Sequence, residues 1–404
     1  MTTYVAEPVA PAARPAPETR VPVPAASTRL LSLDAFRGAT VAGMILVNNP
    51  GTWSAIYPQL EHARWSGWTF TDWIFPFFLW IVGVAITLSF TKRLQKGDAR
   101  GKLLGHAVRR ALIIFGCGLF LAGFPFGLAF GHQFSWLTIR IPGVLQRIAV
   151  CYLAASAVYL YTGLRGQIRW VVALLAGYWL VVKLIPVPGY GAGIVDQPMG
   201  SFPWFVDSNL LAGHTWRGAP APGFDPEGIM STFPAIATTL LGVLTGHWLK
   251  SDRTPEVKTA WMFVAGNFLL LAGAIFDIWL PINKNLWTSS YVIFMAGFAL
   301  VCFATAYWLI DVKGYKRWAM PFVMFGLNAI AVFVLSGLVG RLIYLIKVTG
   351  TDGNPVALQP WIYQHVFLPI ASPINASLLY AICFILVMFA VVWALWKKKI
   401  IIKV

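Results

Sequence analysis

Residues Leu33–Trp80 read LDAFRGATVAGMILVNNPGTWSAIYPQLEHARWSGWTFTDWIFPFFLW, and this stretch decides the fold. Two long apolar segments flank a polar connector, and His62 lies in that connector. An apolar run of about 20 residues is long enough to cross a bilayer as a helix. The stretch therefore predicts two membrane-spanning helices joined by a water-exposed loop that carries an imidazole.

The composition extends this prediction to the whole chain. Of the 404 residues, 58% are hydrophobic and only 11% are charged, whereas about a quarter of the residues of a soluble domain are charged. We therefore expect an all-α polytopic membrane protein, with a single transmembrane domain over residues 29–404 and a disordered leader over the Ala- and Pro-rich residues 1–28. Ten segments are predicted to cross the membrane: 36–50, 70–90, 109–129, 142–162, 168–186, 229–249, 259–280, 288–310, 319–346 and 375–396.

The basic residues predict the orientation. Most Lys and Arg residues fall in one alternating set of connectors, and the positive-inside rule places that set in the cytoplasm together with both termini. His62 and the long connector 187–228 then face outward, and the Gly, Pro and aromatic content of 187–228 predicts an ordered cap with little regular structure. The net charge of +16 is accounted for by these clusters beside the bilayer, so no nucleic-acid partner is expected.

The cysteines suggest neither disulfides nor a metal site. Cys117, Cys151, Cys302 and Cys383 are scattered through apolar segments without CxxC spacing, and no HExxH motif occurs.

His62 is the first candidate catalytic residue, because an imidazole with a pKa near 6.5 can take and release a proton at neutral pH. A lone loop histidine is more often solvated or a helix cap. Asn48, at the end of the first helix, could donate to a developing oxyanion. Asp72, at the start of the second, could fix the imidazole tautomer or could simply cap the helix.

Several charged residues lie at membrane depth, where a charge normally pairs or lines a hydrated path. Asp34 and Arg37 share one face of the first helix, Arg147 lies in RIPGVLQR, and Asp277 lies near the end of the seventh segment. An internal ion-pair network and a ligand site explain these residues comparably well.

Two outward motifs, FDPEG (Phe224–Gly228) and PINKNLW (Pro281–Trp287), mix charges, amides and rings in the manner of carbohydrate sites. The alternative is turn and capping chemistry, with Asp225 capping the sixth helix ahead of Pro226. Asn328, in FGLNAI, is expected to hydrogen bond between helices. The candidate acceptor contacts are Asp225, Glu227, Asn283, Lys284, Asn285 and Trp287.

The ordered blocks LDAFRG, Val47-Asn48, EHARWSGWTFTDWIFPFF, RIPGVLQR, FDPEG, PINKNLW and FGLNAI resemble the heparan-α-glucosaminide N-acetyltransferase family, including its bacterial NagX-like members. The resemblance covers the chain from about residue 30 onward. It implies a ring of transmembrane helices that moves an acetyl group from cytosolic acetyl-CoA to an amino sugar beyond the membrane. It also implies that His62, in the block HARW, is the active-site histidine and that Asn48 is the matching asparagine.

Two departures from the family pattern bear on the acceptor. The connector NNPGTWSAIYPQLEH is longer than in the animal enzyme and contains Pro50, and the animal protein's luminal domain and additional first helix are missing. A lysosomal heparan substrate is therefore not implied. An amino sugar or envelope glycan outside a bacterial inner membrane is the expected acceptor.

The resemblance suggests a mechanism in which His62 acts as a general base or as an acetyl-carrying nucleophile. Arg37 and Arg147, with Asp34 beside Arg37, are the candidate contacts for the phosphates and pantetheine amides of acetyl-CoA. No metal cofactor is expected, and a homodimer is compatible with the sequence. The competing hypothesis is a non-enzymatic transporter or channel for a sugar or amphiphile, which would consume no acetyl-CoA.

Overall fold

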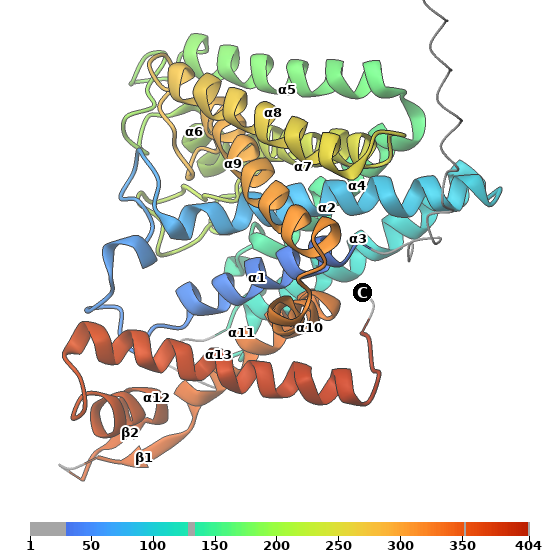
Figure 1. The fold of residues 1–404 in the computed structure, drawn as a ribbon. Helices are drawn as coiled ribbons and strands as arrows, with labels where there is room; N and C mark the ends of the chain where they lie inside the picture. Colours follow the sequence, from blue (N-terminus) through green and yellow to red (C-terminus); the bar gives the residue numbers. More distant parts are fainter. Residues whose placement is uncertain (1–29, 128–133, 351–352, 403–404) are drawn as a thin grey trace, which may run out of the picture. The chain divides into compact units, whose positions relative to one another are not determined.

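The computed structural model describes residues 30–127, 134–350 and 353–402. The predicted disordered leader, residues 1–28, lies outside this range. The bundle formed by the remainder of the chain is almost entirely helical (Figure 1). Its helices are α1 (Leu31–Asn48), α2 (Phe70–Gln95), α3 (Arg100–Gly123), α4 (Val144–Tyr161), α5 (Leu164–Leu184), α6 (Phe202–Leu210), α7 (Ile229–Leu249), α8 (Pro255–Phe276), α9 (Ser289–Tyr307), α10 (Met320–Leu327), α11 (Ala329–Leu345), α12 (Leu358–Ile362) and α13 (Pro373–Lys397). Strands β1 (Lys347–Thr349) and β2 (Pro355–Ala357) form a small antiparallel hairpin.

The polytopic helical fold predicted from composition is confirmed. Among the described residues, eight helices are long and apolar enough to cross a membrane, and the bent pair α10–α11 would make a ninth. Helix α1 corresponds to the first predicted segment and has 18 residues, but it is not among those eight. The predicted third segment, 109–129, is displaced, because α3 begins at Arg100 and ends at Gly123.

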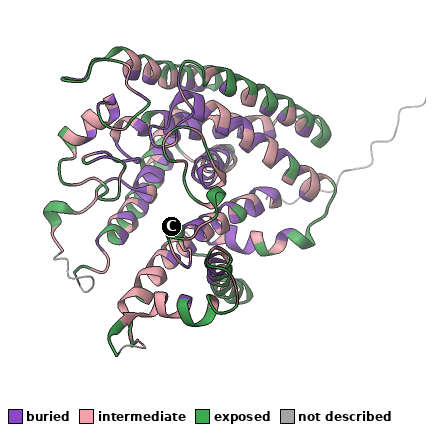
Figure 2. Ribbon diagram, turned by 90° about the vertical axis from the view of Figure 1, so that its left-hand side faces the viewer, coloured by how far each residue is buried: buried purple, intermediate pink, exposed green. Residues whose placement is uncertain are grey.

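The helices form an inner and an outer group. In α2, 72% of the apolar stretch is buried by other helices, against 22% in α8. Large apolar side chains such as Leu112 of α3, Phe268 of α8 and Leu386 of α13 are exposed. Figure 2 shows exposed residues along outer helices and buried ones inside the bundle. Outer faces of this composition match a lipid environment, as expected of a membrane protein.

Helices α2 and α7 pack closely through a reciprocal pair of glycines. A Cβ atom on Gly83 would lie 1.8 Å from the carbonyl oxygen of Thr239, and one on Gly242 would lie 1.9 Å from that of Trp80. Any side chain at either position would push the helices apart. This contact matters because α2 begins beside His62 and α7 begins just after the FDPEG motif.

The predicted single segment 319–346 is broken. Helices α10 and α11 meet at an angle of 74°, and Asn328 stands at the break. Its side chain was expected to bond between helices. Instead, its Nδ2 donates to the carbonyl of Ile400 (3.3 Å) and its Oδ1 accepts from the amide of Ile402 (2.7 Å). The amide therefore ties the segment after α13 to the bend, where helical backbone pairing is interrupted.

Candidate active site

Three loops converge at one end of the bundle. They are the connector 49–69, the cap 187–228 and the turn 277–288. The indole Nε1 of Trp65 donates to the carbonyl of Val195 (2.9 Å), and the amide of Gly67 donates to that of Ile282 (2.7 Å). Apart from α6, the cap is irregular. The connector is thus held against both of the other loops, which fixes the position of His62.

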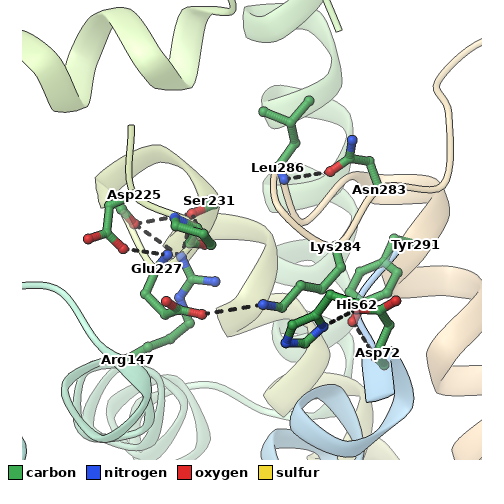
Figure 3. Close-up of polar contacts among 12 residues, drawn as sticks. His62, Asp72, Arg147, Asp225, Glu227, Ser231, Asn283, Lys284, Leu286 and Tyr291 are labelled. Carbon is green, nitrogen blue, oxygen red and sulfur yellow. Dashed lines mark hydrogen bonds and ion pairs between the residues drawn. The ribbon is translucent and has the colours of Figure 1, made fainter. Parts of the chain in front are cut away.

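His62 and Asp72 form a hydrogen-bonded pair (Figure 3). Nδ1 of His62 lies 2.6 Å from Oδ1 of Asp72. The aspartate side chain is 1% exposed and the histidine side chain 50% exposed. An ionised carboxylate can only accept, so Nδ1 carries the proton and Nε2 is left as an acceptor. The pair therefore presents a proton acceptor beside the ion cluster of the outer loops.

Asp72 both hydrogen bonds to His62 and takes part in capping helix α2, the two roles that the sequence left open. Its Oδ1 faces His62, while its Oδ2 accepts from the backbone amides of Ala63 (3.1 Å) and Thr69 (3.0 Å). Thr69 and Asp72 form a capping box at the start of α2. The hydroxyl of Tyr291 donates to the Asp72 carbonyl (2.6 Å). Local sequence and a distant helix together hold this carboxylate in place.

An ion cluster lies next to the pair. Arg140 Nη2 is 2.6 Å from Oε2 of Glu227 and 2.6 Å from Oδ1 of Asp225. Its Nε donates to Asp225 Oδ2 (2.8 Å). On the far side of Glu227, Nζ of Lys284 lies 3.8 Å from Oε1. Figure 3 shows Lys284 extending past His62 toward Glu227, and its charge also interacts with that of Asp72.

The predicted capping role of Asp225 is wrong. Helix α7 follows Gly228 as its N-cap, and the amide of Ile229 donates to Oδ1 of Asp207 (3.0 Å). Asp225 instead accepts from the amides of Trp216 (2.8 Å) and Glu227 (2.9 Å), in addition to binding Arg140. Asp225 is therefore a buried counter-ion of Arg140 that also holds the backbone at the end of the cap through two amide hydrogen bonds.

The charges of this cluster depend on their mutual contacts. Burial alone would raise the pKa of Glu227, but the positive charges of Lys284 and Arg140 outweigh it and hold that pKa well below its usual range. Burial alone would lower the pKa of Arg140, but Asp225 and Glu227 outweigh it and raise that pKa. Both groups are ionised at neutral pH. By contrast, burial raises the pKa of Asp207 to about 7.

Arg147 lies beneath the cluster, fully inside the protein. Its Nη2 donates to the hydroxyl of Ser231 and to the carbonyl of Gly228 (3.3 Å), and its guanidinium stands 5.0 Å from the ring centroid of Trp287. Trp287 Nε1 in turn donates to Thr238 (3.1 Å). Nε and Nη1 of Arg147 have no hydrogen-bond partner among the described residues.

The amides of PINKNLW shape the turn. Asn283 Oδ1 accepts from the amide of Leu286 (2.8 Å), and the Asn283 amide donates to Thr288 (3.1 Å). Asn285 is also buried. Asn283 Nδ2 has no partner among the described residues. The turn thereby directs Lys284 toward the cluster, as Figure 3 shows.

Asn48, Asp34 and Arg37 are not brought to His62. Asn48 ends α1 and lines a cavity of about 460 Å³ that also includes Arg140, but no hydrogen bond joins it to the imidazole within the described residues. Arg37 Nη1 lies 3.2 Å from Oδ1 of Asp34 at the opposite end of α1. The structure therefore separates Arg37 from Arg147.

Two residues of the site were missed from sequence. Arg140 opens the block RIPGVLQR, where only Arg147 was singled out. The available signal was an arginine directly before Ile141-Pro142, in a connector predicted to face outward. Asp207 lies in an aromatic-rich part of the cap, and nothing in its local pattern marks it.

Residues 29–274 match the family described as heparan-alpha-glucosaminide N-acetyltransferase, catalytic. The chain belongs to this family. His62, Asp72, Arg140, Asp225 and Glu227 all lie within the matched residues. The turn that carries Lys284 lies beyond them.

Two curated relatives carry the name heparan-alpha-glucosaminide N-acetyltransferase. The mouse protein is 31% identical over an alignment of 365 positions, which covers 79% of this chain and 54% of the relative. The human protein is 32% identical over an alignment of 356 positions, which covers 76% of this chain and 52% of the relative. The chain thus spans about half the length of these relatives.

Proposed function

We propose that this protein transfers the acetyl group of acetyl-CoA to the amino group of a glucosamine-type acceptor, with His62 as the residue that handles the proton or the acetyl group. The observation that carries the proposal is the His62–Asp72 pair, 2.6 Å apart, with the carboxylate buried and the imidazole half exposed. Membership in the N-acetyltransferase family supports the reaction type.

In direct transfer, the acceptor nitrogen attacks the thioester carbonyl carbon. The C–N bond forms, the C–S bond breaks, and the sulfur leaves as the thiolate of CoA. Nε2 of His62 accepts the ammonium proton of the attacking amine and then gives it to the sulfur. The buried carboxylate of Asp72 stabilises the imidazolium that exists between these two proton transfers.

In the two-step alternative, Nε2 itself attacks the carbonyl carbon and forms an acetyl-imidazole, releasing the CoA thiolate. The acceptor amine then displaces the imidazole. The same tautomer serves both routes, because Nδ1 is engaged by Asp72 in either case. Acetyl-enzyme formed without acceptor distinguishes the routes, since only the two-step path accumulates it.

We place the acceptor beside Glu227 and Lys284. At 3.8 Å their charged atoms attract without a close hydrogen bond, so the carboxylate keeps acceptor capacity for a sugar hydroxyl or ammonium group. The ammonium of Lys284 lies near the imidazole. We therefore assign the stabilisation of the developing oxyanion to Lys284 instead of to the amide of Asn48. Trp287, Asn283 and Asn285 then act by shaping the wall behind these groups.

We further propose that the reaction crosses a bacterial inner membrane, with both termini in the cytoplasm, acetyl-CoA supplied from inside and the acceptor outside. The distribution of basic residues supports this orientation. The paired Asp34 and Arg37 remain candidate contacts for the donor at the inner end of α1.

The test uses full-length protein purified in detergent or reconstituted in vesicles. Incubation with acetyl-CoA and glucosamine should release free thiol in step with N-acetylglucosamine detected by mass spectrometry. A sugar transporter or channel would leave acetyl-CoA intact. Absence of acceptor-dependent thiol release with amino sugars would overturn the proposal.

A further inference from the structure

Two adjoining cavities include Arg140, but not Glu227, in their walls. Each has a volume of about 460 Å³, and both are lined by Leu121, Arg140 and Arg341. Small-molecule sites typically occupy about 300–1,000 Å³. The combined space is therefore large enough for a sugar or for part of a nucleotide, in addition to the groups at His62.

The walls of these cavities are basic. Three arginines contribute, Arg140, Arg217 and Arg341, and no Asp or Glu of the described chain lines either cavity. Arg140 is neutralised by Asp225 and Glu227 behind it. Arg217 only donates to the hydroxyl of Thr138 (3.3 Å), and it has no carboxylate at ion-pair distance within the described residues.

Arg341 needs a counter-ion more than Arg217 does, because Arg217 is exposed and Arg341 is partly buried. It lies in the apolar helix α11, partly buried, and its Nη1 donates to the carbonyl of Gly337 in its own helix (2.9 Å). Across the described residues, no carboxylate forms an ion pair with it. Arg341 lies one turn before the end of α11, and a cation within an apolar helix normally pairs or lines a hydrated path. Arg341 lines both cavities, and no carboxylate of the described residues neutralises it there.

The remaining lining suits a polar ligand. Asn48 at the end of α1 is exposed and lines this cavity, Gly337 and Gly340 leave room on α11, and the aromatic residues Trp53 and Tyr380 complete the wall. The two guanidinium groups without a carboxylate partner among the described residues, together with an amide donor, suit a negatively charged group. The aromatic residues suit an attached ring or chain.

We propose that the two cavities form an oxyanion subsite, in which Arg217 and Arg341 bind a phosphate, sulfate or carboxylate group of a substrate. The subsite rests on the proposed function only for the identity of its ligand. Two sources share this chemistry: an acidic substituent of the acceptor, and the phosphates of the donor, which would then bind at this end of α1 and not beside Asp34 and Arg37 at the other end. Arg140 connects the subsite to the reaction centre, because it lines both cavities and also pairs with Glu227.

The test is equilibrium binding to full-length protein in detergent, measured by calorimetry. The probes are two matched pairs, CoA with pantetheine and glucosamine 6-sulfate with glucosamine. Arg341→Gln removes the charge and Arg341→Lys retains it. The control is Arg165→Gln, an exposed arginine at the start of α5, beyond the opposite end of α4.

Loss of a charge-assisted contact should weaken binding by about 10- to 100-fold. Arg341→Gln should do so for one anionic probe. Arg341→Lys should have an intermediate effect, and binding of the matched probe without the anionic group should change by less than about twofold. Weakened CoA binding assigns the subsite to the donor, and weakened binding of the sulfated sugar assigns it to the acceptor. Equal loss for both members of a pair, or no loss for either anion, would overturn the inference.

These outcomes are separable from the proposed function, because binding requires no turnover. Arg341-dependent anion binding by a protein that transfers no acetyl group would retain the subsite and remove the proposed reaction. Acetyl transfer by a protein whose anion binding is unchanged by Arg341→Gln would retain the proposed reaction and remove the subsite.

Discussion

Replacing Asp72 with Asn tests the role of the buried carboxylate most sharply. The amide can keep an oxygen toward the amides of Ala63 and Thr69, so the start of α2 is preserved. Its NH₂ group then faces Nδ1 of His62, which must become an acceptor. The proton moves to Nε2, and the reactive nitrogen loses its lone pair for the proton or the acetyl carbon.

The expected loss follows from the contact at 2.6 Å. Opposite charges about 4 Å apart at an effective dielectric constant of about 20 attract by about 4 kcal/mol. The half-exposed imidazole reduces this figure, and hydrogen bonds to charged groups contribute about 1.5–3 kcal/mol in mutational studies. At 1.36 kcal/mol per factor of ten, Asp72→Asn should lower kcat by about 10- to 100-fold.

The assay is thiol release from acetyl-CoA at saturating glucosamine, with thermal unfolding measured in parallel. Asp98→Asn, the same substitution at a partly exposed, ion-paired carboxylate just after α2, should leave kcat unchanged. If Asp72→Asn is stable and retains kcat within about threefold of the wild-type value, the argument that the carboxylate sets the tautomer fails.

Three further predictions concern the surroundings of the pair. Burial raises the pKa of Asp207 to about 7, against about 4 when unfolded. The folded state therefore binds an extra proton between these values, and stability falls as pH rises from about 4 through 7. Thermal unfolding of Asp207→Asn should show a shallower fall, and an unchanged slope would contradict this. Gly83→Ala places a Cβ 1.8 Å from a carbonyl oxygen and should cost at least about 2 kcal/mol of stability. Gly116→Ala, with nothing within 4 Å, should cost none in the same melting experiment, so equal melting temperatures would refute the packing argument. Glu227→Gln should raise KM for glucosamine about tenfold, with a smaller change in kcat. An unchanged KM would place the acceptor elsewhere.

The fold was predictable where hydrophobicity alone decides it. Apolar length located nearly every long helix, and the wide polar connector around His62 was visible without a structure. The 74° break at Asn328 was not, because its side chain is tied to Ile400, 72 residues away in the sequence, and a single Gly326 nearby is too weak a local signal.

The site was predictable where partners are close in sequence. His62 and Asp72 are ten residues apart, and a helix start between them brings them together. Arg140 and Glu227 are 87 residues apart, so their contact depends on how the cap folds over α4. Asn48 ends α1 and lines a cavity that His62 does not line, and the connector of 13 residues between them carries no local signal of this separation. The catalytic role of these residues remains a prediction.

The most direct measurement is acetyl transfer by His62→Ala. Purified full-length protein would be assayed for acceptor-dependent thiol release from acetyl-CoA, beside the wild type and His106→Ala, which changes an exposed histidine of α3. Loss of a general base should lower turnover by about 10²–10⁴-fold, while His106→Ala keeps wild-type turnover. A folded His62→Ala protein that transfers acetyl groups at a near wild-type rate would contradict the central claim.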